Sequence, residues 1–278
     1  PGQQRLHITP PTRQQLRRSH QRQHRAVGQQ TSLRHPEALN HRVGGSGSES
    51  SPLTASSGAL AVIPARGGSK GIPGKNLQHV GGLSLVARSV RAALDSRKVE
   101  RVVVSTDDDA IALEAQSHGA EVVRRPAAIA GDTASSESAL LHALDTLEQQ
   151  GPLPPQLVFL QCTSPFTSGG QIDRVLEALE DPKINSAFAV MPWHGFLWRN
   201  DGRGINHDPQ QPRQRRQDLE PAFLETGAIY AMATAAFRQS GSRFCAPWQP
   251  VVIDDAGPEI DTPADLALCR SIAALTAS

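Results

Sequence analysis

A short loop rich in glycine and basic residues is the part of this sequence whose residue types most clearly suggest chemistry. It runs from Pro64 to Asn76 and reads Pro-Ala-Arg-Gly-Gly-Ser-Lys-Gly-Ile-Pro-Gly-Lys-Asn. Its four glycines allow backbone N–H groups to approach an anion closely, and Arg66, Lys70 and Lys75 add three positive charges. A polyphosphate is the natural ligand of such a loop. The alternative is a solvated basic turn between a strand and a helix.

The loop matches neither of two common phosphate-binding motifs. A Walker A loop has Gly, four residues and then Gly-Lys-Ser/Thr, whereas here five residues separate Gly68 from Gly74 and Asn76 replaces the hydroxyl residue. The G-x-G-x-x-G dinucleotide fingerprint also fails, because the glycine spacing is different and basic residues crowd the loop.

Apolar bursts alternate with segments of helical periodicity through most of the chain. This alternation predicts an α/β fold with a doubly wound, mostly parallel sheet and helices on both faces. Ligands of such sheets bind at the carboxyl ends of the strands, where the loop at 64–76 lies. The expected strands are 58–63, 102–104, 121–123, 157–160, 228–232 and 251–253, and the expected helices are 83–96, 110–118, 135–149, 172–179 and one that opens at Thr262.

The regular pattern stops at residues 191–226. Most of this stretch is polar, aperiodic and rich in Gly, Pro and Arg, and it is long for a structureless loop inside a domain. We expect a functional insertion, either a small β-rich subdomain or a dimerisation arm. Its aromatic run Trp193–Trp198 either lines a pocket, packs across an interface or packs in the core.

The first 57 residues are predicted to be a disordered basic extension of a domain at 58–278. Residues 1–58 contain eight Arg, no Lys and two acidic residues, a net charge of +6, so the remainder carries −5 of the total of +1. A segment of this kind buries too little apolar surface to fold. A transit peptide and a nucleic-acid-binding arm are the alternatives.

Composition argues against several classes of protein. An aromatic content of 4% disfavours a stacking platform for single-stranded nucleic acid. The three cysteines lie far apart, which argues against a disulfide framework or a cysteine zinc site and fits a reducing compartment. No apolar run approaches the roughly 18 residues of a spanning helix, and there is no G-x-S-x-G nucleophile elbow. We therefore expect a cytoplasmic protein with neither a nucleic acid nor a membrane as partner.

Several further segments follow the glycine-rich loop in a characteristic order. They are Val104–Asp108, Arg125–Pro126 with Asp132–Ser136, Leu160–Pro165, Gly227–Tyr230 and Glu259–Thr262. Together with the loop they resemble the acylneuraminate cytidylyltransferases, or CMP-sialic acid synthetases, rather than the relatives that activate Kdo. The resemblance covers about Leu60 to Ile272 and departs from the family pattern at three positions. Cys162 replaces a proline, Thr226 an asparagine and Glu259 an aspartate.

This resemblance implies a nucleotide-diphospho-sugar transferase fold and a specific reaction. The anomeric hydroxyl of a nonulosonic acid would attack the α-phosphorus of CTP, and pyrophosphate would leave. Such a reaction demands positioning and charge neutralisation, to which a divalent cation is suited. The catalytic residues implied are Arg66, Lys75 and Asp261, with Lys75 at the α-phosphate.

The resemblance also implies a set of binding residues and a homodimer whose arm reaches the partner's active site. Mg²⁺ (or Mn²⁺) would be held by Asp261 and Glu259, whose side chains fall on one side of an extended segment. The alternative for Asp261 is a helix cap. The sugar acid would contact Gln161, Arg216, Gln217 and Tyr230, with Arg216 at its carboxylate. The nucleotide would contact Ala65, Arg66, Ser69, Lys70, Lys75, Asn76, Arg125, Ser136 and Gln161.

Two alternatives stay open at this point. One is a cytidylyltransferase for a related acid, such as Kdo or a legionaminic- or pseudaminic-type sugar. The other is a nucleotide-binding module of the same fold without turnover, to which the substitutions at Thr226 and Glu259 lend some weight.

Overall fold

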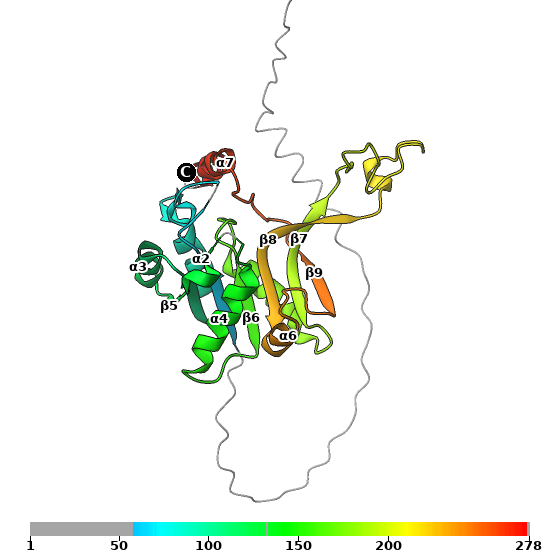
Figure 1. Ribbon diagram of the computed structural model, residues 1–278. Helices are drawn as coiled ribbons and strands as arrows, with labels where there is room; N and C mark the ends of the chain where they lie inside the picture. The colour runs from blue at the N-terminus through cyan, green and yellow to red at the C-terminus, as the bar shows by residue number, and fades with distance from the viewer. Residues whose placement is uncertain (1–57, 70, 132, 277–278) are drawn as a thin grey trace, which may run out of the picture. The chain divides into compact units, whose positions relative to one another are not determined.

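The computed structural model of this 278-residue chain describes residues 58–69, 71–131 and 133–276. The extension expected at 1–57 lies outside the described residues. The described part of the chain is organised around a seven-stranded sheet with the order β5-β4-β1-β6-β8-β7-β9, and a two-stranded hairpin accompanies it (Figure 1). The strands are β1 (Ala59–Pro64), β2 (His79–Val80), β3 (Leu83–Ser84), β4 (Val99–Thr106), β5 (Glu121–Arg124), β6 (Gln156–Leu160), β7 (Ser186–Trp193), β8 (Ala222–Ala233) and β9 (Trp248–Val252).

The sheet is mostly parallel, as the alternation of strands and helices predicted. β5, β4, β1 and β6 pair in parallel, and β7 pairs in parallel with β9. β8 runs antiparallel to both of its neighbours, β6 and β7. The amino-terminal half of β8 therefore lies at the same edge of the sheet as the carboxyl ends of the parallel strands.

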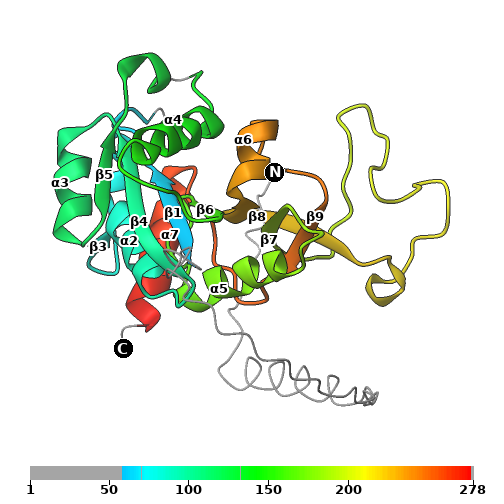
Figure 2. The same ribbon diagram turned by 90° about the horizontal axis from the view of Figure 1, so that it is seen from below.

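Helices cover both faces of the sheet (Figure 2). One core cluster packs α2, α3, α5 and α7 against one face, and a second packs α4 and α6 against the other. Side-chain hydroxyls or carboxylates cap the first turns of four helices, as short polar residues at these positions commonly do, and Ser135 caps α4. The helices are α2 (Leu85–Leu94), α3 (Asp109–Ser117), α4 (Ser136–Glu148), α5 (Gly169–Glu177), α6 (Thr234–Ser240) and α7 (Pro263–Thr276).

The central strand β1 shows why this stretch of sequence forms a two-sided core. Successive side chains of a strand point to opposite faces. Leu60 and Val62 accordingly pack in the α4 cluster, while Ala61 and Ile63 pack in the α2 cluster, and all four are fully buried. Burial of each large aliphatic side chain contributes about 1.5–3 kcal/mol.

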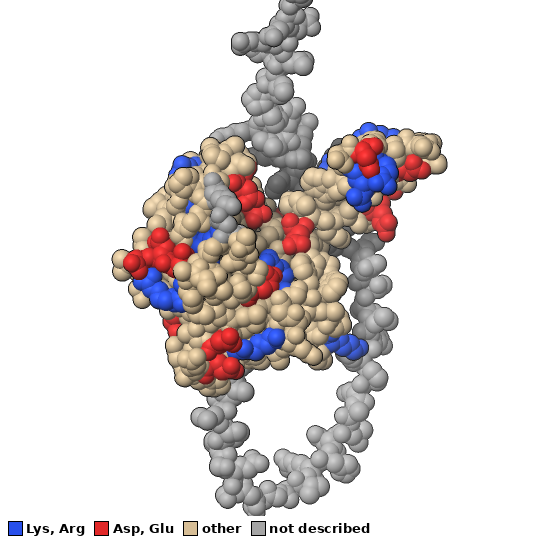
Figure 3. All heavy atoms as spheres, in the orientation of Figure 1, with Lys and Arg blue, Asp and Glu red and all other residues tan. Residues whose placement is uncertain are grey.

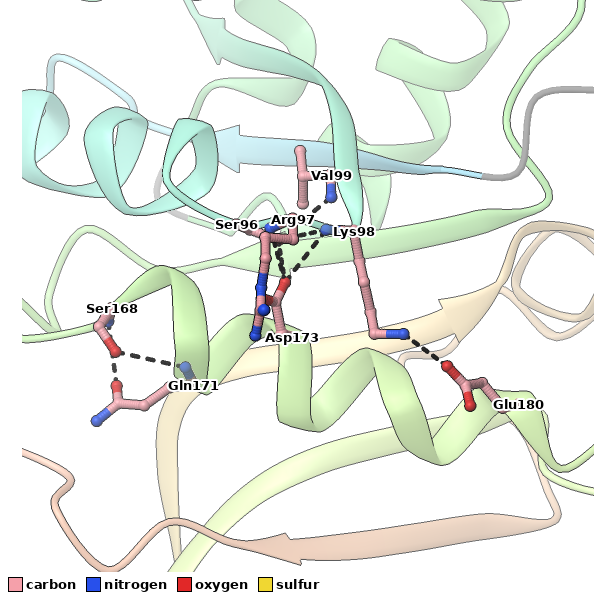
Figure 4. Close-up of polar contacts among 8 residues, drawn as sticks. All are labelled: Ser96, Arg97, Lys98, Val99, Ser168, Gln171, Asp173 and Glu180. Atoms are coloured by element: carbon pink, nitrogen blue, oxygen red, sulfur yellow. Dashed lines mark hydrogen bonds and ion pairs between the residues drawn. The ribbon is translucent and has the colours of Figure 1, made fainter.

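A buried carboxylate fixes the amino-terminal edge of the sheet (Figure 4). Asp173 of α5 accepts hydrogen bonds from the Ser96 hydroxyl at 2.6 Å and from the backbone N–H groups of Arg97 and Lys98 at 3.0 and 3.2 Å. Although burial opposes it, these hydrogen bonds hold the pKa of Asp173 below its ordinary value. Asp173 thereby ties α5 to the turn that starts β4.

The insertion expected at 191–226 is a hairpin arm that continues the two strands β7 and β8. Their pairing extends to Trp193 opposite Ala222, and the chain between them forms an irregular tip that contains η4 (Arg216–Asp218) and an isolated bridge between Trp198 and Gly204. The arm projects from the sheet in Figure 1, and Figure 3 shows basic and acidic side chains side by side on it.

A connecting segment after β9, residues 253–262, returns from the edge strand towards the centre of the sheet before α7 begins (Figure 1). The Ile260 N–H donates to the Thr163 carbonyl at 2.8 Å, and Ile253 and Ile260 are buried in the core. We call this segment the strap. It brings Glu259 and Asp261 to the carboxyl edge of the strands. In the described part of the chain, no helix is long and apolar enough to cross a membrane.

Candidate functional site

β1 delivers the glycine-rich loop to the carboxyl edge of the sheet, and the end of β4 holds it there. The Ala65 N–H donates to the Ser105 carbonyl at 2.9 Å, and the Gly67 N–H donates to an Asp107 carboxylate oxygen at 3.1 Å. A Cβ at Gly67 would lie 2.6 Å from the Asp108 carboxylate, so only glycine fits this close approach. The acidic end of β4 therefore positions the loop.

Further contacts fold the loop back on itself. The Asn76 amide donates to the Arg66 carbonyl at 2.9 Å, and the Arg66 guanidinium donates to the Gly131 carbonyl at 3.0 Å. One amide hydrogen of Asn76 thus stabilises the loop backbone. Ser69 is half-buried in the same loop, and Lys70 lies outside the described residues.

Lys75 and Asp261, both predicted to be catalytic, face each other across the site. Lys75 lies in the short helix η1 (Lys75–Leu77), and its ammonium is 3.2 Å from an Asp261 carboxylate oxygen. A Cβ at Gly71 would lie 2.9 Å from the Asp261 carbonyl, so the loop and the strap are packed closely together. These two residues lie 186 positions apart in the sequence and meet only in the fold.

Capping of α7 belongs to the residues that follow Asp261. The Asp265 carboxylate accepts from the Thr262 N–H at 2.7 Å, and the Thr262 hydroxyl accepts from the Asp265 N–H at 3.3 Å. These reciprocal bonds satisfy the first turn of the helix. The carboxylate of Asp261 is thus directed to Lys75, and the capping alternative for its side chain is wrong.

Glu259 lies in a tight, partly buried position beside Asp261. The Thr163 hydroxyl donates to one of its carboxylate oxygens at 2.8 Å, and a Cβ at Gly227 would come within 3.0 Å of both oxygens. Gly227 has φ +68°, a left-handed conformation that favours glycine. Burial raises the pKa of the Glu259 carboxyl above its ordinary value, and the negative charges of Asp261 and Glu225 raise it further.

The carboxylates of Glu259 and Asp261 fit a magnesium ion. Mg²⁺ is usually bound by one or two carboxylates, with water and substrate phosphate oxygens completing its coordination. The described residues contain no cluster of three or more acidic, His or Cys side chains suited to a metal, so a nucleotide would have to complete the site.

The three residues predicted to contact the nucleoside are Arg125, Ser136 and Gln161, and they lie along the carboxyl edge of the sheet. Arg125 is buried and donates to the Ser105 carbonyl at 2.6 Å; burial lowers the pKa of its guanidinium, which the charge of Asp107 opposes. Ser136 is the first residue of α4. The Gln161 N–H donates to the Ala228 carbonyl at 3.2 Å just after β6, and this side chain is half-buried.

Tyr230 contacts Glu225 because of an irregularity in β8. Phe188 of β7 pairs with Tyr230 but Val190 pairs with Glu225, so β8 contains extra residues between them. The Thr226 hydroxyl stabilises this bulge by accepting from the Ala228 N–H at 3.3 Å. Thr226 therefore has a structural role in place of the family's asparagine. The Tyr230 hydroxyl donates to the Glu225 carboxylate.

Arg216 and Gln217, the other predicted sugar contacts, lie elsewhere. They are exposed in η4 on the arm, which Figure 1 shows projecting from the sheet. In the part of the chain that the structure describes, no hydrogen bond or ion pair joins them to the loop or strap. Within the arm, the Arg213 guanidinium lies 4.1 Å from the Phe196 ring centre, and the Trp198 ring contacts His207.

Sequence reasoning missed three residues that shape this site: Asp107, Thr163 and Glu225. Asp107 and Thr163 lie within the segments Val104–Asp108 and Leu160–Pro165, so the signal that could have found them was present. Glu225 lies just before the bulge, whose geometry no sequence spacing reveals.

Comparison with known proteins gives consistent results. A family model described as "Cytidylyltransferase" matches residues 60–196. The N-acylneuraminate cytidylyltransferase of Oncorhynchus mykiss is 35% identical over 189 residues, which are 64% of this chain and 42% of that protein. The CMP-N,N'-diacetyllegionaminic acid synthase of Legionella pneumophila is 31% identical over 223 residues, or 77% of this chain and 95% of that protein. The pseudaminic acid cytidylyltransferase of Campylobacter jejuni is 29% identical, covering 76% and 94%.

The chain spans 42% to 49% of the length of the N-acylneuraminate cytidylyltransferases that it matches. Among solved structures, a CMP:2-keto-3-deoxy-manno-octonic acid synthetase complexed with CTP is similar, with a TM-score of 0.62, 21% identity and coverage of 79% of this chain and 100% of that one. That likeness shows a shared fold. By its 31% identity to a relative of which it covers 95%, together with the family match, the chain belongs to the cytidylyltransferase family that includes the acylneuraminate cytidylyltransferases.

Proposed function

We propose that the protein transfers CMP from CTP to the anomeric hydroxyl of a sialic-acid-type nonulosonic acid and releases pyrophosphate. The observation that carries this proposal is the meeting of Lys75 and Asp261 at 3.2 Å, beside Glu259 and against the glycine-rich loop. A cation for phosphate oxygens and two carboxylates for a metal thus share one site. The names of the similar proteins support CTP and a sugar acid as substrates.

In the proposed reaction, the anomeric oxygen forms a bond to the α-phosphorus of CTP as the bond from that phosphorus to the α,β-bridging oxygen breaks. Pyrophosphate takes the bonding electron pair, and the hydroxyl proton passes to solvent. Lys75 would leave Asp261 and neutralise charge on the α-phosphate, while Arg66 and the loop N–H groups bind the outer phosphates. Mg²⁺ held by Asp261 and Glu259 would neutralise the triphosphate and orient it.

The cytidine would lie over Arg125, Ser136 and Gln161. These residues come from the ends of β5, α4 and β6, which place them along one edge. The Gln161 side-chain amide offers both a donor and an acceptor, which suits the edge of cytosine. Arg125 offers further N–H donors beyond the bonds that it makes to Ser105.

The sugar acid would lie near Gln161 and Tyr230, with the arm of a second copy supplying Arg216 and Gln217 in a homodimer. Two observations support this arrangement: Arg216 is exposed on the projecting arm, and apolar side chains are exposed on or next to it. Trp198 is 52% and Phe223 49% exposed, which leaves apolar surface for a partner to cover. The cytoplasmic location stays a prediction.

A related acid is the second candidate substrate. The chain covers 94% to 95% of the legionaminic and pseudaminic enzymes named above, against less than half of the N-acylneuraminate enzymes. The reaction and the catalytic residues would be the same, and only the contacts to the sugar would differ.

Pyrophosphate release from CTP tests both versions. The purified chain would be assayed with Mg²⁺ and N-acetylneuraminic, legionaminic, pseudaminic or 3-deoxy-manno-octulosonic acid, with ATP, GTP and UTP as controls. Release that needs CTP and one acid supports the proposal and names the substrate. CTP binding without release with any acid would instead favour a non-catalytic module.

A further inference from the structure

A half-buried arginine that the proposed mechanism does not use lies beneath Tyr230. Arg243, in the loop between α6 and β9, pairs with Glu137 in the first turn of α4 at 2.6 Å. Its side chain is 18% exposed and that of Glu137 21%. A charged pair shielded from water to this extent needs good geometry to offset the loss of hydration, so the contacts around Arg243 matter for keeping it in place.

The guanidinium of Arg243 also covers two aromatic rings. Its central carbon lies 4.8 Å from the ring centres of both Phe159 and Tyr230, and these rings stack on each other at 5.4 Å. Cations lie favourably over aromatic faces at such distances. Arg243 thus contacts Tyr230 of β8 on one side and the Glu137 carboxylate of α4 on the other.

These contacts form a continuous chain across the edge of the sheet, in the order Glu137, Arg243, Tyr230 and Glu225. Glu137 directly follows Ser136, which is proposed to face the cytidine, and the Tyr230 hydroxyl binds Glu225 at the bulge. Two residues further along this bulge, a Cβ at Gly227 would come within 3.0 Å of the Glu259 carboxylate in the strap. The chain therefore runs from the nucleoside end of the site to its metal end.

We propose that Arg243 is a positioning residue, which fixes the Tyr230 phenol and, through it, the Glu225 carboxylate. The side chains of Tyr230 and Glu225, here called the wall, bind hydroxyl and amide groups of the sugar acid. Tyr230 uses its proton on Glu225, so the second carboxylate oxygen of Glu225 is the acceptor that this wall presents to a sugar N–H or O–H group. This inference rests on the proposed function for the identity of the ligand.

Arg243 is not needed to attach α4 to this part of the chain, because another arginine already links α4 to the neighbouring helix α6. Arg238 of α6 binds Asp145 and Glu148 in the later turns of α4, at 2.7 and 3.0 Å. This second pair lies at the far end of α4 from Ser136. Arg238→Gln is therefore a matched control: it removes an arginine–carboxylate link to the same helix, α4, without touching Tyr230.

The kinetic test compares Arg243→Gln with Arg238→Gln, using the acid of the four-member panel that gives turnover. For Arg243→Gln we expect the KM for the sugar acid to rise at least tenfold while the KM for CTP changes less than twofold. Arg243→Lys, which keeps the charge, should recover part of the loss, and Arg238→Gln should leave both KM values within twofold. Equal rises in both KM values for Arg243→Gln would overturn the proposal.

The second test uses the fact that Tyr230 is the single tyrosine of the chain. Tyrosine labelled with ¹³C at Cζ gives one NMR signal, which reports on the phenol and its hydrogen bond. Arg243→Gln should move this signal without any ligand and abolish the change that the sugar acid causes in the wild type, whereas Arg238→Gln should do neither. If Arg243→Gln leaves this signal in place, the positioning role is refuted. This result can be obtained even if no acid on the panel is turned over, so failure of the positioning role is distinguishable from failure of the proposed function.

Discussion

Replacing Lys75 with methionine separates its role in catalysis from its role in the fold. Methionine keeps most of the aliphatic volume and removes the ammonium group. The pair with Asp261 is open to water on one side, because the Asp261 side chain is 71% exposed while that of Lys75 is 14% exposed. Losing a pair of this kind lowers the free energy of unfolding by about 1 kcal/mol or less.

The effect on turnover should be far larger. If Lys75 neutralises the α-phosphate in the transition state, it acts like one preorganised donor of an oxyanion site, whose loss reduces kcat about 100- to 1,000-fold, or about 2.7–4 kcal/mol. The Lys75→Met variant should therefore melt near the wild-type temperature and release pyrophosphate at under about 1% of the wild-type rate.

The assay is pyrophosphate release at saturating CTP and sugar acid, with thermal unfolding measured in parallel. Lys98→Met is the matched control, since Lys98 forms a similar pair with Glu180 at 2.5 Å, but at the opposite edge of the sheet (Figure 4). It should retain full activity. If Lys75→Met keeps more than a third of the wild-type kcat, the assignment of Lys75 to the α-phosphate is wrong.

Three other variants test separate parts of the structure. Asp173→Ala leaves buried donors unpaired and should lower the unfolding free energy at pH 7 by about 3 kcal/mol, as measured by urea titration. Because the pKa of Asp173 is lowered in the folded state, the carboxylate contributes fully to stability above its unfolded pKa of about 3.9, and this contribution is lost as the pH falls through the folded pKa. A difference in unfolding free energy between variant and wild type that stays constant down to pH 2 would contradict this. Glu259→Gln keeps the bond from Thr163 and should raise the Mg²⁺ concentration for half-maximal activity at least about tenfold, and an unchanged magnesium titration would make Glu259 purely structural. Gly67→Ala forces a contact with Asp108, whose side chain caps α3, and should lower the melting temperature and raise the KM for CTP at least fivefold. A normal KM would show that the loop tolerates the shift.

Local patterns made the first half of the sheet predictable. β1, β6 and the second half of β4 are apolar runs buried on both faces, and the segments that follow them contain helices of evident periodicity. The loop after β1 could therefore be placed at the carboxyl edge. The insertion at 191–226 was predicted, but its hairpin pairing and the antiparallel direction of β8 were not, because strand pairing depends on contacts remote in sequence. For example, the predicted strand at 228–232 covers only the buried half of β8, since its exposed half has no core-facing alternation.

The site was predictable only where a motif carried it. Lys75 and Asp261 were named from separate segments, and the structure brings them together. The partnership of Glu137 with Arg243 spans 106 positions and lies outside every recognisable motif, so no spacing rule pointed to it. Roles for Arg216 and Gln217 depend on a second copy and stay predictions.

The strap has a consequence for how the protein is made. The amino terminus of a chain leaves the ribosome first. The glycine-rich loop therefore emerges long before the acidic residues that face it, since Asp261 follows Lys75 by 186 positions. A nascent chain that ends before Glu259 contains every strand of the sheet but lacks both carboxylates proposed to bind metal. The completed site is thus a late event of synthesis, and truncated products would be expected to hold nucleotide weakly without consuming it.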